Sequence, residues 1–277
     1  MTTDTPTLPR AAGLRSAPGG RAAGRLNSVL LPAAGLLLAG AGWWLATLVF
    51  DIKTVILPPP NEVWDAFRRL PGYLLEQTWV TLRRTVLGFA WSVAAGLLLG
   101  LVIAGSAVVE RMFYPLLVGV NAIPKVALAP MLVAWLGFGE KPVTVMVFLL
   151  CFFPIVLSTA TGLMSTPAEL AELSRSLSAS RWHTFVKIRF PAALPQIFVG
   201  LKVGMPLAAV GAVIGEFQSG VDGGLGFVIL STSGIGDTPT ALAAIVLVAL
   251  ISIPLFYAVV LAERLLLPWV RETTSQR

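Results

Sequence analysis

Charged residues are scarce in this sequence. Asp, Glu, Lys and Arg make up 12% of its 277 residues, whereas soluble domains carry about 25%. Hydrophobic residues make up 56%, and the mean hydropathy is +0.83. A chain with so few polar side chains cannot cover a water-exposed globule. The composition therefore excludes an ordinary soluble domain and predicts a protein partly surrounded by membrane lipid.

Residue types that support metal or redox chemistry are almost absent. The chain has one cysteine, Cys151, and one histidine, His183. A single cysteine excludes an intrachain disulfide, and a lone histidine without a neighbouring ligand does not form a metal-binding pattern. We expect no metal site.

Nucleotide and nucleic-acid motifs are also missing. The sequence contains no Gly-x-x-x-x-Gly-Lys-Ser/Thr loop, and the glycine-rich stretch 220–226 lacks the lysine. The net charge of +6 is not concentrated in a basic stripe interleaved with aromatic residues. We therefore predict that the chain binds no nucleic acid and does not itself hydrolyse ATP by phosphate-loop chemistry.

Long apolar runs are what the sequence does have. A helix needs roughly 20 apolar residues to cross the hydrocarbon core of a bilayer. The sequence predicts an all-α integral membrane protein with six transmembrane helices, at 28–50, 85–106, 112–137, 142–162, 196–216 and 240–262. The third run contains Lys125 and three prolines, so we expect it to be broken or kinked.

The basic residues predict the orientation of these spans. With both termini in the cytoplasm, twelve Lys and Arg residues lie inside and six outside. We therefore expect a cytoplasmic tail at each end, with 1–27 disordered and 268–277 following the last span. Residues 51–80 should be periplasmic and contain a short helix after Pro60, either on the membrane surface or covering the bundle.

The sizeable polar segment between the fourth and fifth predicted spans is the predicted cytoplasmic loop 163–195. Residues 166–169 form a capping box that starts a helix, and 178–180 interrupt the helical pattern. A second short helix should follow and end at Phe190, because Pro191 disfavours helical geometry in the residue before it. The loop is thus predicted to contain two amphipathic helices joined by a tight turn.

This loop resembles a signature of permease subunits in bacterial ATP-binding-cassette importers. The signature is Glu-Ala-Ala, three residues, Gly, nine residues, and Ile-x-Leu-Pro. Here Glu172-Leu173-Ser174 precedes Ser178 by three residues, and Ile188-Arg189-Phe190-Pro191 follows after nine. The spacing matches in full, although Leu173, Ser174, Ser178 and Phe190 replace the residues of the signature.

The resemblance covers about residues 57–270, the 81–267 region being the permease core. Several motifs are similar to the nitrate, sulfonate and taurine branch, which includes importers of pyrimidine precursors and of riboflavin. They are LPPPNEV at 57–63, IPKVALAP at 123–130, WLGFG at 135–139 and PAALP at 191–195. The motif PQIFVGLK at 195–202 is more similar to the importers of pyrimidine precursors and of riboflavin.

The resemblance implies a type I importer permease in the bacterial cytoplasmic (inner) membrane. Such a subunit is not an enzyme: a separate ATPase subunit binds ATP and Mg²⁺, and this chain binds no cofactor. The other implied partners are membrane lipid, a periplasmic or lipid-anchored solute-binding protein, and a second permease copy, usually an identical one. Dimerisation would form the alternating-access path. The solute is left open, with a pyrimidine precursor or riboflavin slightly favoured.

Two sets of candidate site residues follow. The resemblance implies that the loop 163–195 docks on the ATPase, through Glu169, Glu172, Ser178, Trp182, Phe185, Ile188 and Pro191. Ionisable groups within spans are costly and normally face the bundle interior or water. Lys125 and Glu216 are therefore candidates for the solute path, although Lys125 could equally be a structural residue in the broken helix.

Two other functions remain open from the residues alone. An ion-coupled secondary transporter would favour inverted repeats with matching broken helices, but only one broken span is predicted. A membrane scaffold without transport is the other alternative. The long capped loop favours the importer subunit over both.

Overall fold

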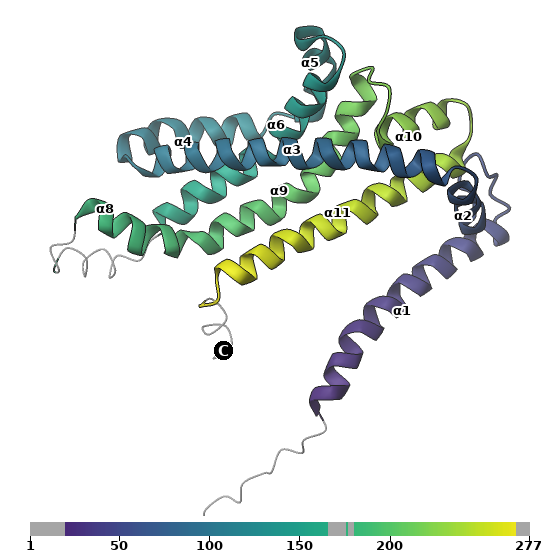
Figure 1. Ribbon diagram of the computed structural model, residues 1–277, viewed down its shortest axis with the longest axis horizontal. Coiled ribbons are helices and arrows are strands. Elements are labelled where there is room, and N and C mark those ends of the chain that lie inside the picture. The colour runs from purple at the N-terminus through teal and green to yellow at the C-terminus, as the bar shows by residue number, and fades with distance from the viewer. Residues whose placement is uncertain (1–19, 166–175, 177–179, 270–277) are drawn as a thin grey trace, which may run out of the picture. The chain divides into compact units, whose positions relative to one another are not determined.

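The computed structural model describes residues 20–165, 176 and 180–269 (Figure 1). These residues form helices and no strands. The chain divides into two compact units, Met1–Lys53 and Thr54–Arg277. The first contains α1 (Gly20–Val49). The second contains α2 (Pro60–Arg69), α3 (Pro71–Ala104), α4 (Ala107–Asn121), the 3-10 helix η1 (Lys125–Leu128), α5 (Ala129–Leu136), α6 (Glu140–Met164), α8 (Arg181–Thr184), the π-helix η2 (Phe185–Arg189), α9 (Phe190–Gln218), α10 (Leu225–Gly234) and α11 (Thr238–Leu266).

The first unit consists of a single described helix. Helix α1 begins at Gly20, so residues 20–27 are helical and the expectation of a disordered tail over 1–27 was wrong for them. The part of α1 from Ala34 to Val49 is apolar. Large side chains there are well exposed, as Leu36 and Leu48 illustrate. An exposed apolar helix of this kind is suited to lipid rather than water.

Four helices of the second unit are long and apolar enough to span a membrane. They are α3, α6, α11 and the continuous helix Trp182–Gln218 that includes α9. Half of the most apolar stretch of both α6 and α9 is buried, against 11% in α11. Helices α6 and α9 therefore form the centre of the bundle. The protein is a multi-pass membrane protein.

A bent pair of helices follows α3. Helix α4 and the segment Lys125–Leu136 together are apolar enough for one more span, but they meet at an angle of 79°. The bend lies at Pro124, whose ψ of 94° is extended, and Lys125 starts the next helical turn. The predicted break in the 112–137 segment is confirmed. Pro115, by contrast, lies inside α4 without ending it.

Small residues let α3 approach α6 closely. Gly88, Gly96 and Gly100 follow one another along a single face of α3. A Cβ on Gly96 would lie 2.7 Å from Cγ2 of Ile155, and one on Gly100 would lie 2.5 Å from Cγ2 of Thr159. Close backbone approach at small residues is the usual way in which helices associate inside membranes.

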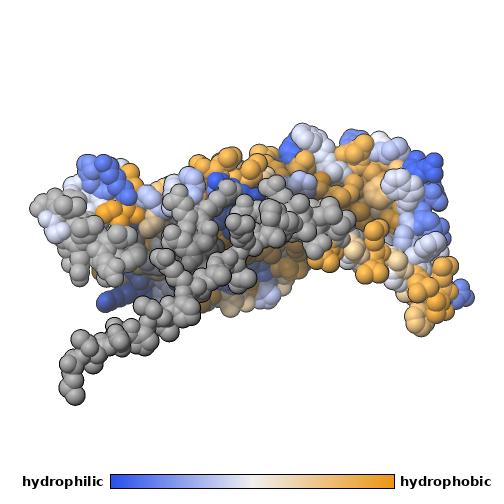
Figure 2. Space-filling model, turned by 90° about the horizontal axis from the view of Figure 1, so that it is seen from below, coloured by the Kyte–Doolittle hydropathy of each residue, from blue (hydrophilic) through white to orange (hydrophobic). Residues whose placement is uncertain are grey.

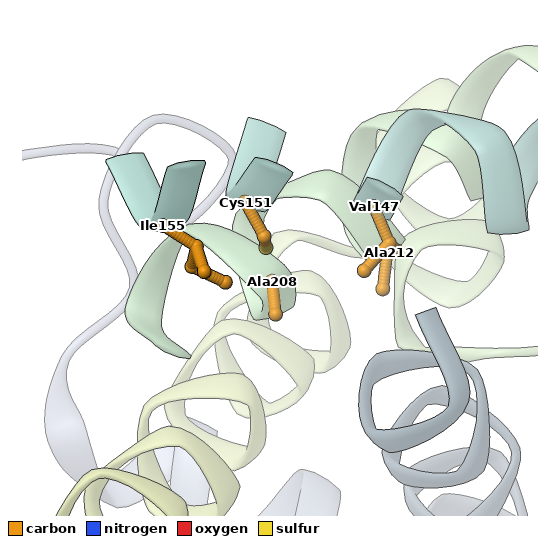
Figure 3. Packing of buried hydrophobic residues seen from close by; sticks show 5 residues of the cluster. All are labelled: Val147, Cys151, Ile155, Ala208 and Ala212. Atoms are coloured by element: carbon orange, nitrogen blue, oxygen red, sulfur yellow. The ribbon is translucent and has the colours of Figure 1, made fainter. Parts of the chain in front are cut away.

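Helix α9 packs on α6 in the same manner. A Cβ on Gly211 would lie 2.8 Å from Cα of Val147, and one on Gly215 would lie 2.8 Å from Cα of Val143. Figure 3 shows side chains of α6 directed toward α9. The buried cluster between the two helices consists of Val147, Cys151, Ile155, Ala208 and Ala212.

The surface of the second unit is strongly apolar along its long helices. Leu98 on α3, Leu116 on α4 and Leu250 on α11 are each more than half exposed. Apolar residues cover broad areas of the visible face in Figure 2. Contiguous apolar surface of this extent favours contact with lipid or with another membrane-embedded chain.

A short helix begins at the last of the three prolines at 58–60. Helix α2 begins at Pro60, buries Val63 and Ala66, and packs mainly on α11. Its Trp64 is 63% exposed. The hydroxyl of Thr238 at the start of α11 donates to the carbonyl of Val55 at 2.7 Å. Helix α2 therefore covers one end of the bundle, and an aromatic side chain remains free on its outer face.

The helix that includes α9 differs from expectation at its start. We predicted that a helix would end at Phe190, but the chain is helical without interruption from Trp182 to Gln218. The π-helix η2 ends two residues before Pro191, and the Phe190 amide donates to the Phe185 carbonyl five residues back. A π turn shifts the carbonyl that would otherwise clash with the proline ring, so the helix continues.

Candidate functional site

One buried ion cluster joins four helices at the end of the bundle where α6 begins and α9 ends. We call it the Arg84 cluster. Its members are Gln77, Thr81 and Arg84 of α3, Glu140 of α6, Glu216 of α9, and the backbone of residues 223–226 around the start of α10.

Arg84 is the centre of this cluster, and its side chain is 4% exposed. Its Nε and Nη2 donate to the two carboxylate oxygens of Glu140 at 2.9 and 2.7 Å. Its Nη1 donates to Glu216 Oε1 at 2.9 Å and to the Gly223 carbonyl at 2.7 Å. A two-pronged guanidinium–carboxylate pair is among the stronger polar contacts in proteins. Arg84 thus connects α3 to α6, α9 and the loop before α10.

Glu216 has no exposed side-chain surface. In addition to Arg84, its carboxylate accepts from the Thr81 hydroxyl at 3.0 and 3.1 Å and from the Gly226 amide at 2.8 Å. Burying a carboxylate is costly unless its charge is paired and its oxygens are hydrogen-bonded. Both conditions are met here. In this conformation, the path candidate Glu216 is enclosed by Arg84, Thr81 and the Gly226 amide and reaches no open surface.

The amides at the start of α10 donate hydrogen bonds to side chains of α3 and α9. The Gly224 amide donates to Gln77 Oε1 at 2.6 Å, and the Leu225 amide donates to the Thr81 hydroxyl at 2.7 Å. The Gly226 amide donates to Glu216. The first amides of a helix have no partner within it and favour a nearby negative charge. Side chains more than 130 positions away in sequence therefore cap α10 together with Glu216.

Two glycines make this capping possible. Gly224 has a φ of +102°, which disfavours any residue with a side chain. A Cβ there would collide with the Glu216 carboxylate, and a Cβ on Gly226 would lie 2.7 Å from Glu216 Cβ. The backbone at positions 224 and 226 approaches Glu216 so closely that only glycine fits there.

Glu216, on one side of the cluster, is fully buried, whereas Glu140, on the other side, is exposed. The side chain of Glu140 is 52% exposed, and Arg83, which is 58% exposed, lies 3.8 Å from it. Exposed ion pairs contribute little to stability, typically about 0–1 kcal/mol. The Arg83–Glu140 contact therefore adds little, whereas removing Arg84 would leave the buried Glu216 carboxylate without a counter-ion.

Lys125 lies at the break between α4 and η1. Its Nζ donates to the backbone carbonyl of Asn121 at 2.8 Å and to its side-chain carbonyl at 2.9 Å. The same Nζ is 4.9 Å from the ring centroid of Phe153, a distance typical of a cation–π contact. Phe153 is near the middle of α6. Lys125 therefore caps the end of α4 and lies level with the central part of α6.

The partners of Lys125 are neutral. Within the part of the chain that the structure describes, no carboxylate lies within 4.0 Å of its Nζ. Lys202, the other lysine in a span, instead pairs with Glu263 of α11 at 2.8 Å. Of these two lysines, Lys125 is the one without a carboxylate partner among the described residues.

The predicted ATPase-docking residues are described in part. Glu169, Glu172 and Ser178 lie outside the described residues. Trp182 is 71% exposed, and its ring stacks on that of Phe185 with 6.1 Å between centroids.

The remaining predicted docking residues connect this tip to the bundle. Ile188 and Pro191 are half-buried. Phe185 and Phe190 pack against the buried cluster of Leu163, Ala193 and Ile197. An exposed indole is thus joined, through a row of aromatic rings, to the packing between α6 and α9.

Sequence reasoning missed Arg84, Gln77 and Thr81, and placed the second span at 85–106 instead of Pro71–Ala104. Arg84 directly precedes the uncharged run that begins at Thr85, so hydropathy alone gives no reason to include it in the span. A usable signal was present, because Glu216 in an apolar run requires a counter-ion. The spacing of Gly88, Gly96 and Gly100 on α3 was a second signal that had not been used.

Comparison with known proteins places this architecture in a family. The family of binding-protein-dependent transport system inner membrane components matches residues 94–272. The riboflavin transport system permease protein RibX of Chloroflexus aurantiacus is 35% identical over 238 residues, covering 84% of this chain and 88% of the relative.

Two further relatives support the same assignment. The formylaminopyrimidine transport permease protein ThiX of Halalkalibacterium halodurans is 37% identical over 189 residues, covering 68% of this chain and 75% of the relative. The putative aliphatic sulfonates transport permease protein SsuC of Bacillus subtilis is 29% identical over 268 residues, covering 95% of each chain. The chain belongs to the family of membrane permease subunits of binding-protein-dependent transport systems, and such subunits are not themselves enzymes.

Proposed function

We propose that this chain is the permease of an ATP-driven importer for a small organic solute, and that it forms the solute path together with a second copy of itself. The observation that carries the proposal is the family match over residues 94–272 together with the full-length similarity to named transport permeases. A separate ATPase subunit would bind ATP and Mg²⁺. A periplasmic or lipid-anchored binding protein would deliver the solute.

The proposed topology has six spans in the bacterial inner membrane. They are α1, α3, the bent pair α4–α5, α6, α9 and α11, with both termini in the cytoplasm. The bent pair supports this count because its combined length and hydropathy are those of one span. The excess of Lys and Arg in the segments assigned to the cytoplasm supports the orientation.

The proposed contact with the ATPase is the segment around 163–191. Trp182 supports it, since an aromatic side chain that is 71% exposed in an isolated chain is typical of an interface anchor. Glu169, Glu172 and Ser178 belong to the proposed contact through the signature spacing. Phe185, Ile188 and Pro191 would transmit displacement of this tip to α9, because the helix is continuous between them.

For the proposed solute path, Lys125 is a stronger candidate than Glu216 to contact the solute. Lys125 lies at a helix break and has only neutral partners in the described residues, which suits a group that meets solute. Glu216 would act on the path indirectly, through the position of α10. The names of RibX and ThiX favour riboflavin or a pyrimidine precursor as the solute.

Co-purification tests this function against a secondary transporter or a scaffold. The importer requires an ATPase that remains bound to the permease through detergent extraction and size-exclusion chromatography. We expect an ATPase subunit in near 1:1 ratio with this chain. Recovery of the permease alone, together with solute uptake driven by an ion gradient, would establish the secondary transporter instead.

A further inference from the structure

The short helix α10 is fixed to its neighbours by polar contacts, which is unusual for an apolar helix of ten residues. The helix is too short to cross a bilayer, and its sequence, LGFVILSTSG, begins with six residues that carry no polar side chain. The amides of Gly224, just before the helix, and of Leu225 and Gly226, its first two residues, donate to Gln77, Thr81 and Glu216 respectively. Burial of Leu225 and Val228 is complete.

One guanidinium supports the contacts at both Gly223 and Gly226, beside the separate contacts of Gln77 and Thr81. Arg84 pairs with Glu216, which holds the Gly226 amide, and also donates directly to the Gly223 carbonyl. The same group binds Glu140 at the start of α6. If Arg84 is removed, Glu216 remains as a buried carboxylate without a counter-ion, which is strongly unfavourable. The ends of α3, α6 and α9 and the start of α10 therefore form one electrostatic unit.

We propose that Arg84 is a positioning residue for transport: it locks α10 to α3, α6 and α9, so that α10 moves with these helices as one rigid body and does not open separately as a flap. The inference rests on the proposed function in that it assigns α10 to the periplasmic end of the path. Access to the path would then change at the contact between two permease copies.

The geometry favours a permanent lock over a switch. The Glu216 carboxylate is bonded to Arg84, Thr81 and the Gly226 amide, and glycine at 224 and 226 lets the backbone approach it closely. A helix that detached in each transport cycle would have to expose a buried ion pair and three amides each time. Weak or water-mediated contacts would suit such a flap better.

Cysteine accessibility measures the lock directly. Cys151 is the single cysteine of the chain and is fully buried, and its thiol donates to the Gly204 carbonyl, so Cys151→Ser gives a suitable background. Val228→Cys then places a thiol on the buried face of α10. The permease is assembled with its ATPase in proteoliposomes and labelled with a membrane-impermeant maleimide, first at rest and then trapped with ATP and vanadate.

We expect Val228→Cys to label slowly in both states when Arg84 is present, with rates that agree within about twofold. Adding Arg84→Met should raise the labelling rate at least tenfold. Lys202→Met is the matched control, because it breaks an ion pair fourteen residues from Glu216 along α9, and it should leave the labelling rate unchanged. Thr81→Val, which removes one capping hydroxyl, should give an intermediate rate.

Two results would overturn the proposal. Fast labelling in the vanadate-trapped state with Arg84 intact would show that α10 detaches during the cycle. Continued protection in an assembled Arg84→Met variant would show that the lock is unnecessary. The trapped-state comparison does not depend on whether Arg84→Met folds. Labelling only from the cytoplasmic side would contradict the proposed topology and the place of α10 in it, whereas loss of ATP-dependent uptake in the parent protein would contradict the proposed function alone.

Discussion

Lys202 of α9 and Glu263 of α11 form an ion pair across two membrane helices, with Nζ 2.8 and 3.0 Å from the two carboxylate oxygens. Their side chains are 27% and 23% exposed, so the pair is partly shielded from water. Glu263 lies three residues before the end of α11, whereas α9 continues for twelve residues beyond Lys202 toward Phe190. The pair therefore fixes the level at which α11 ends against α9.

Breaking this pair should weaken the contact between α9 and α11. We expect a coupling free energy of about 1 kcal/mol between Lys202→Met and Glu263→Gln, since the pair is only partly buried. A double-mutant cycle on the free energy of unfolding in detergent measures it. Additive effects of the two substitutions would show that the contact contributes nothing to the fold.

The close approach of α3 to α6 predicts a second effect. Gly96→Leu would force a large side chain into the space occupied by Ile155. We expect the free energy of unfolding to fall by about 1–3 kcal/mol. Gly119→Leu is the matched control, because no atom lies within 4 Å of the Cβ position on Gly119. Equal unfolding temperatures for the two variants would contradict the packing described here.

The fold was predictable from the sequence where a single local property determines it. The break near Pro124 follows from proline chemistry, and the apolar runs identify the central parts of the long helices. The ends of those helices were not predictable in this way. Helix α3 extends fourteen residues before the charge-free run because Arg84 is neutralised by Glu140 and Glu216, which are distant in sequence. The continuity through Pro191 depends on a π turn that has no simple sequence signal.

The candidate site was predictable to a similar extent. Glu216 and Lys125 stand out in the sequence because charges are rare in apolar runs. Their different surroundings could not be derived, since these depend on which helix ends meet in space. Glu216 is enclosed by partners from α3 and α10, whereas Lys125 contacts the preceding turn and an aromatic ring.

A role of Lys125 in the solute path can be separated from its role in capping α4. Lys125→Met removes both the ammonium and the cap, whereas Asn121→Ala removes one acceptor and keeps the charge. We expect Lys125→Met to lower uptake about tenfold, equivalent to about 1.4 kcal/mol, and Asn121→Ala to retain at least half of it. Equal uptake by the two variants at equal stability would remove Lys125 from the path.

The exposed tip at Trp182 predicts an effect on assembly without an effect on folding. Trp182→Ala should weaken binding of the ATPase by at least about 2 kcal/mol, or roughly 30-fold in Kd, because aromatic anchors dominate such interfaces. Trp64→Ala in α2 is the matched control, with 63% exposure at the other end of the bundle. Unfolding temperatures of both variants should equal that of the parent. An unchanged ATPase affinity in Trp182→Ala would exclude this tip from the docking surface.

The central claim is that ATP hydrolysed on a separate subunit drives solute through this chain. Uptake into proteoliposomes tests it, using the permease with and without its ATPase, loaded binding protein outside, and ATP inside. We predict uphill accumulation of riboflavin or a pyrimidine precursor when permease, ATPase and ATP are all present, and none when any one is omitted. Uphill accumulation by this chain alone, driven by an ion gradient, would contradict the account.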